Sequence, residues 1–170
     1  MILKIKYNET INIEEEVMIT LEKLEKYDET GANNYAMELF HKGFTCAEAL
    51  MYTLNKYLDI GLDEKTFAMA SGFPWGLGGG GCICGALAGA SMIIGTKYGR
   101  QSFNETRSNN CFPINEELHD KFKEACGGTC CRVLMKELDR DDPKRKENCS
   151  QYVKDTLKIT VELLKKYETL

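Results

Sequence analysis

Residues 72–89 read GFPWGLGGGGCICGALAG and include eight glycines. Glycine is costly inside helices and strands, so the part of this stretch up to Gly81 predicts a loop rather than regular structure. A helix is expected to follow over residues 84–98, and its small residues Gly85 and Gly89 would let another helix approach closely. The stretch therefore predicts a glycine-rich loop that leads into a closely packed helix.

Upstream of the loop, apolar residues recur at helical spacing. The apolar positions of residues 11–27 lie four, four and three residues apart, which is typical of an amphipathic helix, and Gly31 is expected to end it. Thr45 and Asp63 are typical N-cap residues. Further helices are therefore predicted over residues 33–41, 46–57 and 64–70.

Downstream of the loop, apolar residues at helical spacing and glycine breaks predict three more helices. They are expected over residues 115–125, 130–138 and 149–167, with breaks at Gly127 and Gly128. Residues 99–113 form a polar stretch and residues 139–148 a charged one, and both are expected to be connections. With no alternating β-branched run, the chain is predicted to be all-α. We expect a compact helical bundle of one domain over 1–170, with an N-terminal extension at 1–30 and a cysteine-rich redox core at 33–167.

Composition and charge exclude several classes of partner. The chain of 170 residues has 22 basic and 26 acidic residues, a net charge of −4, so no basic surplus exists to bind nucleic acid. The longest weakly polar run, residues 82–95, is too short to span a membrane, and the N-terminus lacks the apolar stretch of a signal peptide. We therefore expect a cytoplasmic protein without membrane insertion. A reducing cytosol would argue against structural disulfides.

Eight cysteines are the unusual feature of the composition, namely Cys46, Cys82, Cys84, Cys111, Cys126, Cys130, Cys131 and Cys149. They form no C-x-x-C pair, and no C-x-x-C-H motif for covalent haem attachment, so no haem is expected. Several are predicted at helix starts, where the free N–H groups and the helix dipole would favour the thiolate that binds metals. Each cysteine taken alone could equally be a small buried hydrophobe, but eight exceed ordinary usage for this length.

The glycine loop supports a site at these thiols. Backbone N–H groups that donate to sulfur tune iron–sulfur clusters, and glycines can present them without steric obstruction. Gly79, Gly80, Gly81 and Gly85 are therefore candidate cofactor-binding residues. The loop also fits the pattern GxGxxG, but no strand precedes it, which argues against a dinucleotide site.

The motifs around four of the cysteines resemble a known family. Cys84 begins CGALAG, which matches CGAxxG; GFTCAEA surrounds Cys46, CRVL begins at Cys131, and CSQYV begins at Cys149. Together, over about residues 33–164, they resemble the C_GCAxxG_C_C family of redox-active proteins. The resemblance implies a small helical protein with these four as its core cysteines, distantly similar to the iron–sulfur part of split-Soret cytochromes.

Three functions follow as hypotheses. The first is an iron–sulfur protein, with Cys46, Cys84, Cys131 and Cys149 as metal ligands, that acts in electron transfer or redox sensing with an unknown partner. The second is a metal-free thiol–disulfide oxidoreductase, with Cys84 as the nucleophile and Cys131 or Cys149 as the resolving thiol. The third is a structural zinc-binding module. The pair Gly85 and Gly89 could also serve a homodimer contact.

Overall fold

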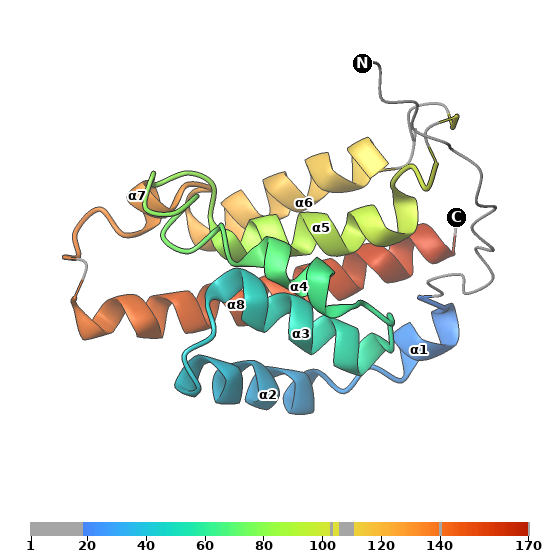
Figure 1. Ribbon diagram of the computed structural model, residues 1–170, viewed down its shortest axis with the longest axis horizontal. Helices are drawn as coiled ribbons and strands as arrows, with labels where there is room; N and C mark the ends of the chain where they lie inside the picture. Colours follow the sequence, from blue (N-terminus) through green and yellow to red (C-terminus); the bar gives the residue numbers. More distant parts are fainter. Residues whose placement is uncertain (1–18, 103, 106–110, 140, 170) are drawn as a thin grey trace, which may run out of the picture.

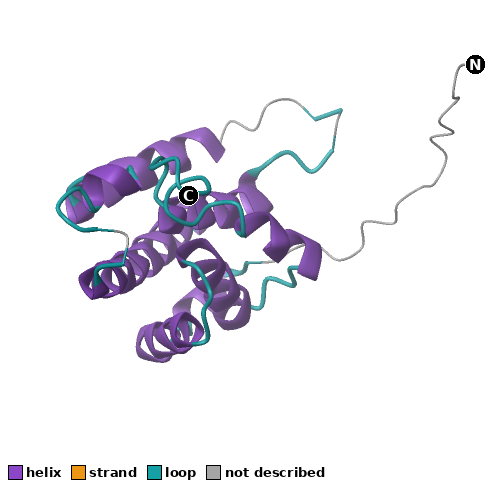
Figure 2. Ribbon diagram, turned by 60° about the vertical axis from the view of Figure 1, so that its left-hand side comes forward, coloured by secondary structure: helices purple, strands orange, loops and turns teal. Residues whose placement is uncertain are grey.

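The computed structural model describes residues 19–102, 104–105, 111–139 and 141–169. All the regular structure in these ranges is helical, as Figure 2 shows, so the predicted all-α class is confirmed. The helices are α1 (Leu21–Glu25), α2 (Glu29–His41), α3 (Cys46–Leu58), α4 (Glu64–Ala70), α5 (Gly85–Tyr98), α6 (Cys111–Cys126), α7 (Cys131–Leu134) and α8 (Pro143–Glu168).

Helix α5 lies at the centre of the bundle. It packs against α3, α6 and α8, and all of its first six residues are buried. Its sequence explains this position, because a helix that is weakly polar all round is stable only when other helices cover it. The longest helix, α8, adds a buried stripe that includes Val153, Leu157 and Leu164.

Small residues let α3 and α5 lie close together. A Cβ atom added at Gly89 would lie 3.0 Å from the carbonyl oxygen of Ala47, and one added at Gly85 would collide with Sγ of Cys46. The expected close helix approach at these glycines is therefore an intramolecular contact with α3. The possible homodimer stays a prediction.

The chain path brings several helix starts to one end of the bundle. In Figure 1, α3, α5 and α8 all begin at the end where the glycine loop and α7 lie, and α2 and α6 finish there. Helices α3, α5 and α8 are therefore parallel neighbours, and α2 and α6 run in the opposite direction. Segments that are distant in the sequence thus meet at this end.

Two of the upstream helix starts agree with the sequence, and other boundaries differ. Helix α2 begins at Glu29 rather than at residue 33. Thr45 and Asp63 are the N-caps of α3 and α4, as predicted. Gly31 does not end a helix but lies in the first turn of α2, where its N–H donates to the capping carboxylate of Asp28 (2.9 Å). Of the helix predicted over 11–27, residues 11–18 lie outside the described residues, and α1 covers only Leu21–Glu25.

Three downstream boundaries also differ from the prediction. Helix α6 begins at Cys111 rather than at residue 115. Helix α8 begins at Pro143 rather than at residue 149, because Asp142 caps it and proline suits the first helical position. Helix α7 ends at Leu134 rather than at Leu138, since the chain then forms a turn in which the N–H of Leu138 donates to the carbonyl of Met135 (3.0 Å).

Candidate functional site

The glycine-rich loop folds back on itself beside α7. Gly76 has a φ of +72°, and a Cβ atom there would lie 2.5 Å from the backbone nitrogen of Cys82, so only glycine fits this crossing. Gly81 in turn lies against Arg132, whose N–H donates to the Gly81 carbonyl (2.9 Å) and whose guanidinium donates to the Gly80 carbonyl (2.8 Å). The loop therefore forms a platform for the short helix α7.

A disulfide between Cys82 and Cys130 joins the loop to α7. The expectation that the chain would lack structural disulfides is therefore wrong for this pair. The expectation rested on an inferred reducing compartment, whereas the fold brings these two cysteines, 48 residues apart in sequence, to a Cα–Cα distance of 4.4 Å. Cys46, Cys84, Cys126, Cys131 and Cys149 are free thiols.

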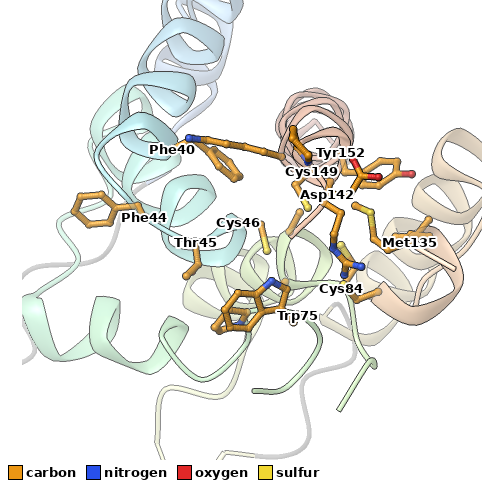
Figure 3. A pocket seen from close by; sticks show the side chains of 18 of the residues that line it. Phe40, Phe44, Thr45, Cys46, Trp75, Cys84, Met135, Asp142, Cys149 and Tyr152 are labelled. Carbon is orange, nitrogen blue, oxygen red and sulfur yellow. The ribbon is translucent and has the colours of Figure 1, made fainter. Parts of the chain in front are cut away.

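The four cysteines singled out by the motifs line one cavity of about 530 Å³. Cys46 is the first residue of α3, Cys84 is the N-cap of α5, and Cys131 is the first residue of α7. Cys149 lies in the second turn of α8 rather than at a helix start, because α8 begins six residues earlier than predicted. Figure 3 shows Cys46, Cys84 and Cys149 around this space, with Trp75 of the loop beside them.

The remaining walls of the cavity are mostly apolar and aromatic. They come from the loop, from the turn between α2 and α3, and from the segments around α7 and α8, and they include Phe40, Phe44, Pro74, Trp75, Leu134, Met135 and Tyr152. Charged side chains, including Asp142 and Arg145, lie on the side formed by the start of α8. The thiols thus share a cavity that is apolar on most sides and charged on one.

Burial raises the pKa of three cavity thiols, Cys46, Cys84 and Cys149, which corrects the expectation that helix starts would lower it. For Cys46 burial is the largest cause, followed by the nearby thiols of Cys84 and Cys149. Burial also raises the pKa of Cys84, although two backbone N–H groups oppose the shift. The pKa of Cys149 is raised to about 12 by burial and then by Cys84 and Cys131, against the opposing charge of Arg145. Desolvation of the thiolate outweighs the helix dipole here.

The N–H groups that reach these sulfurs come from helix starts. The N–H of Ala47 donates to Cys46, and those of Ala86 and Leu87 donate to Cys84. The N–H groups of Gly79, Gly80 and Gly81 donate instead to carbonyls of the loop itself, and these three glycines do not line the cavity. Gly85 does line it, directly beneath Cys46. A cofactor-binding role for the four glycines stays a prediction.

Two neighbours of Cys149 escaped the sequence analysis. Arg145 and Tyr152 precede and follow Cys149 by four and three residues, so all three share one face of α8 and line the cavity. The Arg145 guanidinium is held by a hydrogen bond to the Leu138 carbonyl (2.8 Å). The pair Asp142-Pro143 was the available signal, because a helix begun there would have placed both residues beside Cys149.

The two remaining cysteines are Cys111 and Cys126, the first and last residues of α6. Cys126 is partly buried, and its pKa is raised to about 12 by burial first and then by Asp155 and Cys84. Cys111 accepts a hydrogen bond from the side chain of Asn115 (3.4 Å). Neither lines the cavity.

The residues that the structure describes lack two kinds of feature. No helix among them is both long enough and apolar enough to cross a membrane. They also contain no cluster of three or more Cys, His, Asp or Glu side chains already spaced to hold a metal ion. The four thiols therefore share a cavity without forming a closed ligand shell.

The fold and the cavity define an all-α protein with four cysteines gathered at one end of a bundle. The chain belongs to the C_GCAxxG_C_C family, whose model, described as "Putative redox-active protein (C_GCAxxG_C_C)", matches residues 44–163. It is 29% identical over 146 residues to an uncharacterized protein of Archaeoglobus fulgidus, covering 81% of this chain and 96% of that protein. No solved structure matches the chain significantly.

Proposed function

We propose that this chain binds an iron–sulfur cluster through Cys46, Cys84, Cys131 and Cys149 and acts in electron transfer or redox sensing. The observation that carries the proposal is that these four thiols, from four separate segments, line a single cavity. Packing alone would not require cysteines from four segments to share a cavity, because a small buried hydrophobe serves equally well at separate sites.

Thiolates in this cavity would need a compensating positive charge. Burial raises the pKa of Cys46, Cys84 and Cys149, and neighbouring thiols raise those of Cys46 and Cys149 further. Several thiolates together in an apolar cavity would repel one another without a compensating charge. A metal centre supplies that charge, so metal binding and thiol deprotonation would occur together.

The residues present fit an iron–sulfur group in chemistry and in room. Four thiols supply the ligand type that such clusters require. The volume of about 530 Å³ lies within the usual range of ligand cavities, about 300–1,000 Å³. The N–H groups of Ala47, Ala86 and Leu87 already donate to ligand sulfurs, an interaction that tunes reduction potential. When bound, the cluster would supply one-electron redox chemistry.

The two other hypotheses differ in what the cavity supports. A nucleophilic Cys84 would need a lowered pKa, whereas burial raises it, so the cavity favours metal binding over thiol exchange at Cys84. A structural zinc ion would use the same four thiols. Metal analysis separates the zinc and iron hypotheses.

The test is anaerobic purification followed by reconstitution with iron and sulfide. We expect a brown protein with a broad absorption band at about 400 nm and acid-labile sulfide. Single Cys→Ser variants at 46, 84, 131 and 149 should bind less iron, whereas Cys111→Ser, a thiol outside the cavity, should match the parent chain. A colourless protein that retains no iron would refute the proposal, and stoichiometric zinc alone would replace it with the structural alternative.

A further inference from the structure

The disulfide Cys82–Cys130 lies next to the four-thiol cavity but takes no part in lining it. Cys130 directly precedes Cys131, and Cys82 lies two residues before Cys84. The bridge therefore links the two segments of chain that carry these two cavity thiols.

Hydrogen bonds flank the disulfide on both sides. The N–H of Cys84 donates to the carbonyl of Thr129 (2.8 Å), and the N–H of Arg132 donates to the carbonyl of Gly81 (2.9 Å). These bonds and the bridge hold the loop and α7 side by side. Their geometry also places Cys131, which is only 8% exposed, beside the cavity.

Apart from the loop, helix α7 is held mainly by Leu134, which packs against the core, and by the buried Met135 that follows it. It has one turn, Cys131–Leu134, and it packs on the loop rather than broadly against another helix. Gly127 and Gly128 precede it, and a four-residue helix is unstable by itself. The position of Cys131 therefore depends strongly on the attachment to the loop.

The disulfide is also open to reagents in solution. Cys82 is exposed and Cys130 is partly buried. Thiol–disulfide exchange needs a thiolate to approach one sulfur of the bridge, and the exposed Cys82 gives that access.

We propose that Cys82 and Cys130 form a second redox centre, an exchangeable disulfide that dithiols reduce from solution and that controls how firmly Cys131 is held at the cavity. A thiolate of the dithiol attacks Sγ of Cys82, the bond to Cys130 breaks, and the Cys130 thiolate takes up a proton. The second thiolate of the dithiol then attacks the mixed disulfide and releases Cys82, which is protonated. The protein gains two electrons and two protons, and the dithiol leaves as its own disulfide.

Opening the bridge removes the covalent link between the loop and α7 and leaves hydrogen bonds and the packing of Arg132 against Gly81. Local unfolding of α7 then becomes easier, and Cys131 is exposed more often. Because Cys131 is a ligand in the function proposed above, reduction should also weaken metal retention there. That last consequence rests on the proposed function, whereas the exchange reaction and the exposure of Cys131 do not.

The test uses the full metal-free chain, oxidised in air. Denatured protein should show six free thiols, and peptide mapping should join Cys82 to Cys130. Dithiothreitol should then increase the rate at which iodoacetamide modifies Cys131 by about tenfold or more. The double variant Cys82→Ser/Cys130→Ser should show the same fast rate without reductant. It leaves Cys131 as the only cysteine of residues 127–139. The matched variant Cys111→Ser/Cys126→Ser should keep the disulfide and the slow rate.

The outcomes distinguish failure of the disulfide proposal from failure of the iron–sulfur function. Eight free thiols in the oxidised protein, or a Cys131 rate that reduction leaves unchanged, would overturn the proposal. Reduction of wild-type protein gives the same comparison if the double variant does not fold. For protein loaded with metal, we expect a chelator to remove the metal about tenfold faster after reduction. A chain that binds no metal would refute the iron–sulfur function alone, because the thiol count and the alkylation rate are measured without metal.

Discussion

Cys149 shows how burial and charge act on a single residue of the cavity. It is partly buried in the second turn of α8, with Arg145 one turn before it and the thiols of Cys84 and Cys131 nearby. Burial is the main reason that its pKa rises to about 12, and Arg145 offsets only part of the shift. In the metal-free protein this thiol is therefore neutral at physiological pH.

This raised pKa predicts a loss of stability in alkaline solution. In the unfolded chain Cys149 ionises near its ordinary pKa of 9.0, whereas in the folded chain it keeps its proton up to about 12. The unfolded state thus binds fewer protons in this window, so the free energy of unfolding falls as the pH rises through it. Urea denaturation of metal-free protein at pH 8, just below that window, and at pH 10, in its lower third, measures the fall.

A matched pair of variants isolates the contribution of Cys149. Cys149→Ser removes the ionisable thiol, so its stability should fall less between the two pH values than that of the parent chain. Ser150→Ala, on the next residue of the same helix, removes no titrating group and should keep the parental slope. Equal slopes for all three proteins would show that Cys149 does not titrate as the structure indicates.

At the scale of the helices, the contact between α3 and α5 brings Cys46 to the cavity. Gly85, the first residue of α5, lies directly against Sγ of Cys46, and Gly89 lies against the backbone of Ala47. Gly95, in the last turn of α5, has no neighbouring atom within 4 Å of where a Cβ would be. The two ends of α5 therefore respond differently to the same substitution.

Gly85→Ala should destabilise the protein by about 1–3 kcal/mol, because the added methyl group must displace Cys46 or separate the helices. Gly95→Ala has room for the methyl group and should be neutral or stabilising by up to about 1 kcal/mol, since alanine favours the helix. Thermal unfolding of both variants measures the difference. If Gly85→Ala proved as stable as Gly95→Ala, Cys46 would not lie against the start of α5.

The sequence predicted helix type better than helix ends. The caps Thr45 and Asp63 place the starts of α3 and α4, because a single side chain decides each. Helix α7 was predicted too long, since Leu138 has an apolar side chain that suits a helix while its backbone is held in a turn and by Arg145. A tertiary contact of this kind leaves no signal in the local pattern.

The same limit applied to the site. The motifs selected the four cysteines that line the cavity, but their ionisation depended on burial, which spacing does not reveal. The pairing of Cys82 with Cys130 was equally inaccessible, because the loop and α7 meet only in the folded chain. The start of α8 at Pro143 was readable and would have placed Arg145 beside Cys149.

Across the whole molecule, the direction of the helices matters as much as their packing. Helices α3, α5 and α8 begin at the same end of the bundle (Figure 1), and their first residues line the cavity, so the positive ends of three helix dipoles converge on it. Burial keeps Cys46, Cys84 and Cys149 neutral in the metal-free protein, but the same dipoles would stabilise the negative charge of thiolates once a metal is bound. The bundle thus favours an anionic metal centre over free thiolates.

The only tryptophan of the chain, Trp75, reports on whether the segments meet around a bound group. It lies in the glycine loop, lines the cavity and is 55% exposed. An iron–sulfur cluster absorbs in the range of tryptophan emission, so a cluster in the cavity should strongly quench the fluorescence of Trp75. Anaerobic reconstitution with iron and sulfide, followed by emission spectra, measures this effect. Free N-acetyltryptophanamide in the same solution corrects for absorption by unbound iron.

The quenching should depend on ligands from different helices. Cys46→Ser/Cys149→Ser removes one thiol from α3 and one from α8, and its Trp75 emission should stay close to that of metal-free protein. Cys111→Ser lies outside the cavity and should be quenched like the parent chain. Equal quenching in both variants would mean that the iron binds elsewhere, because a centre that needs all four segments is lost when two of them no longer supply a thiol.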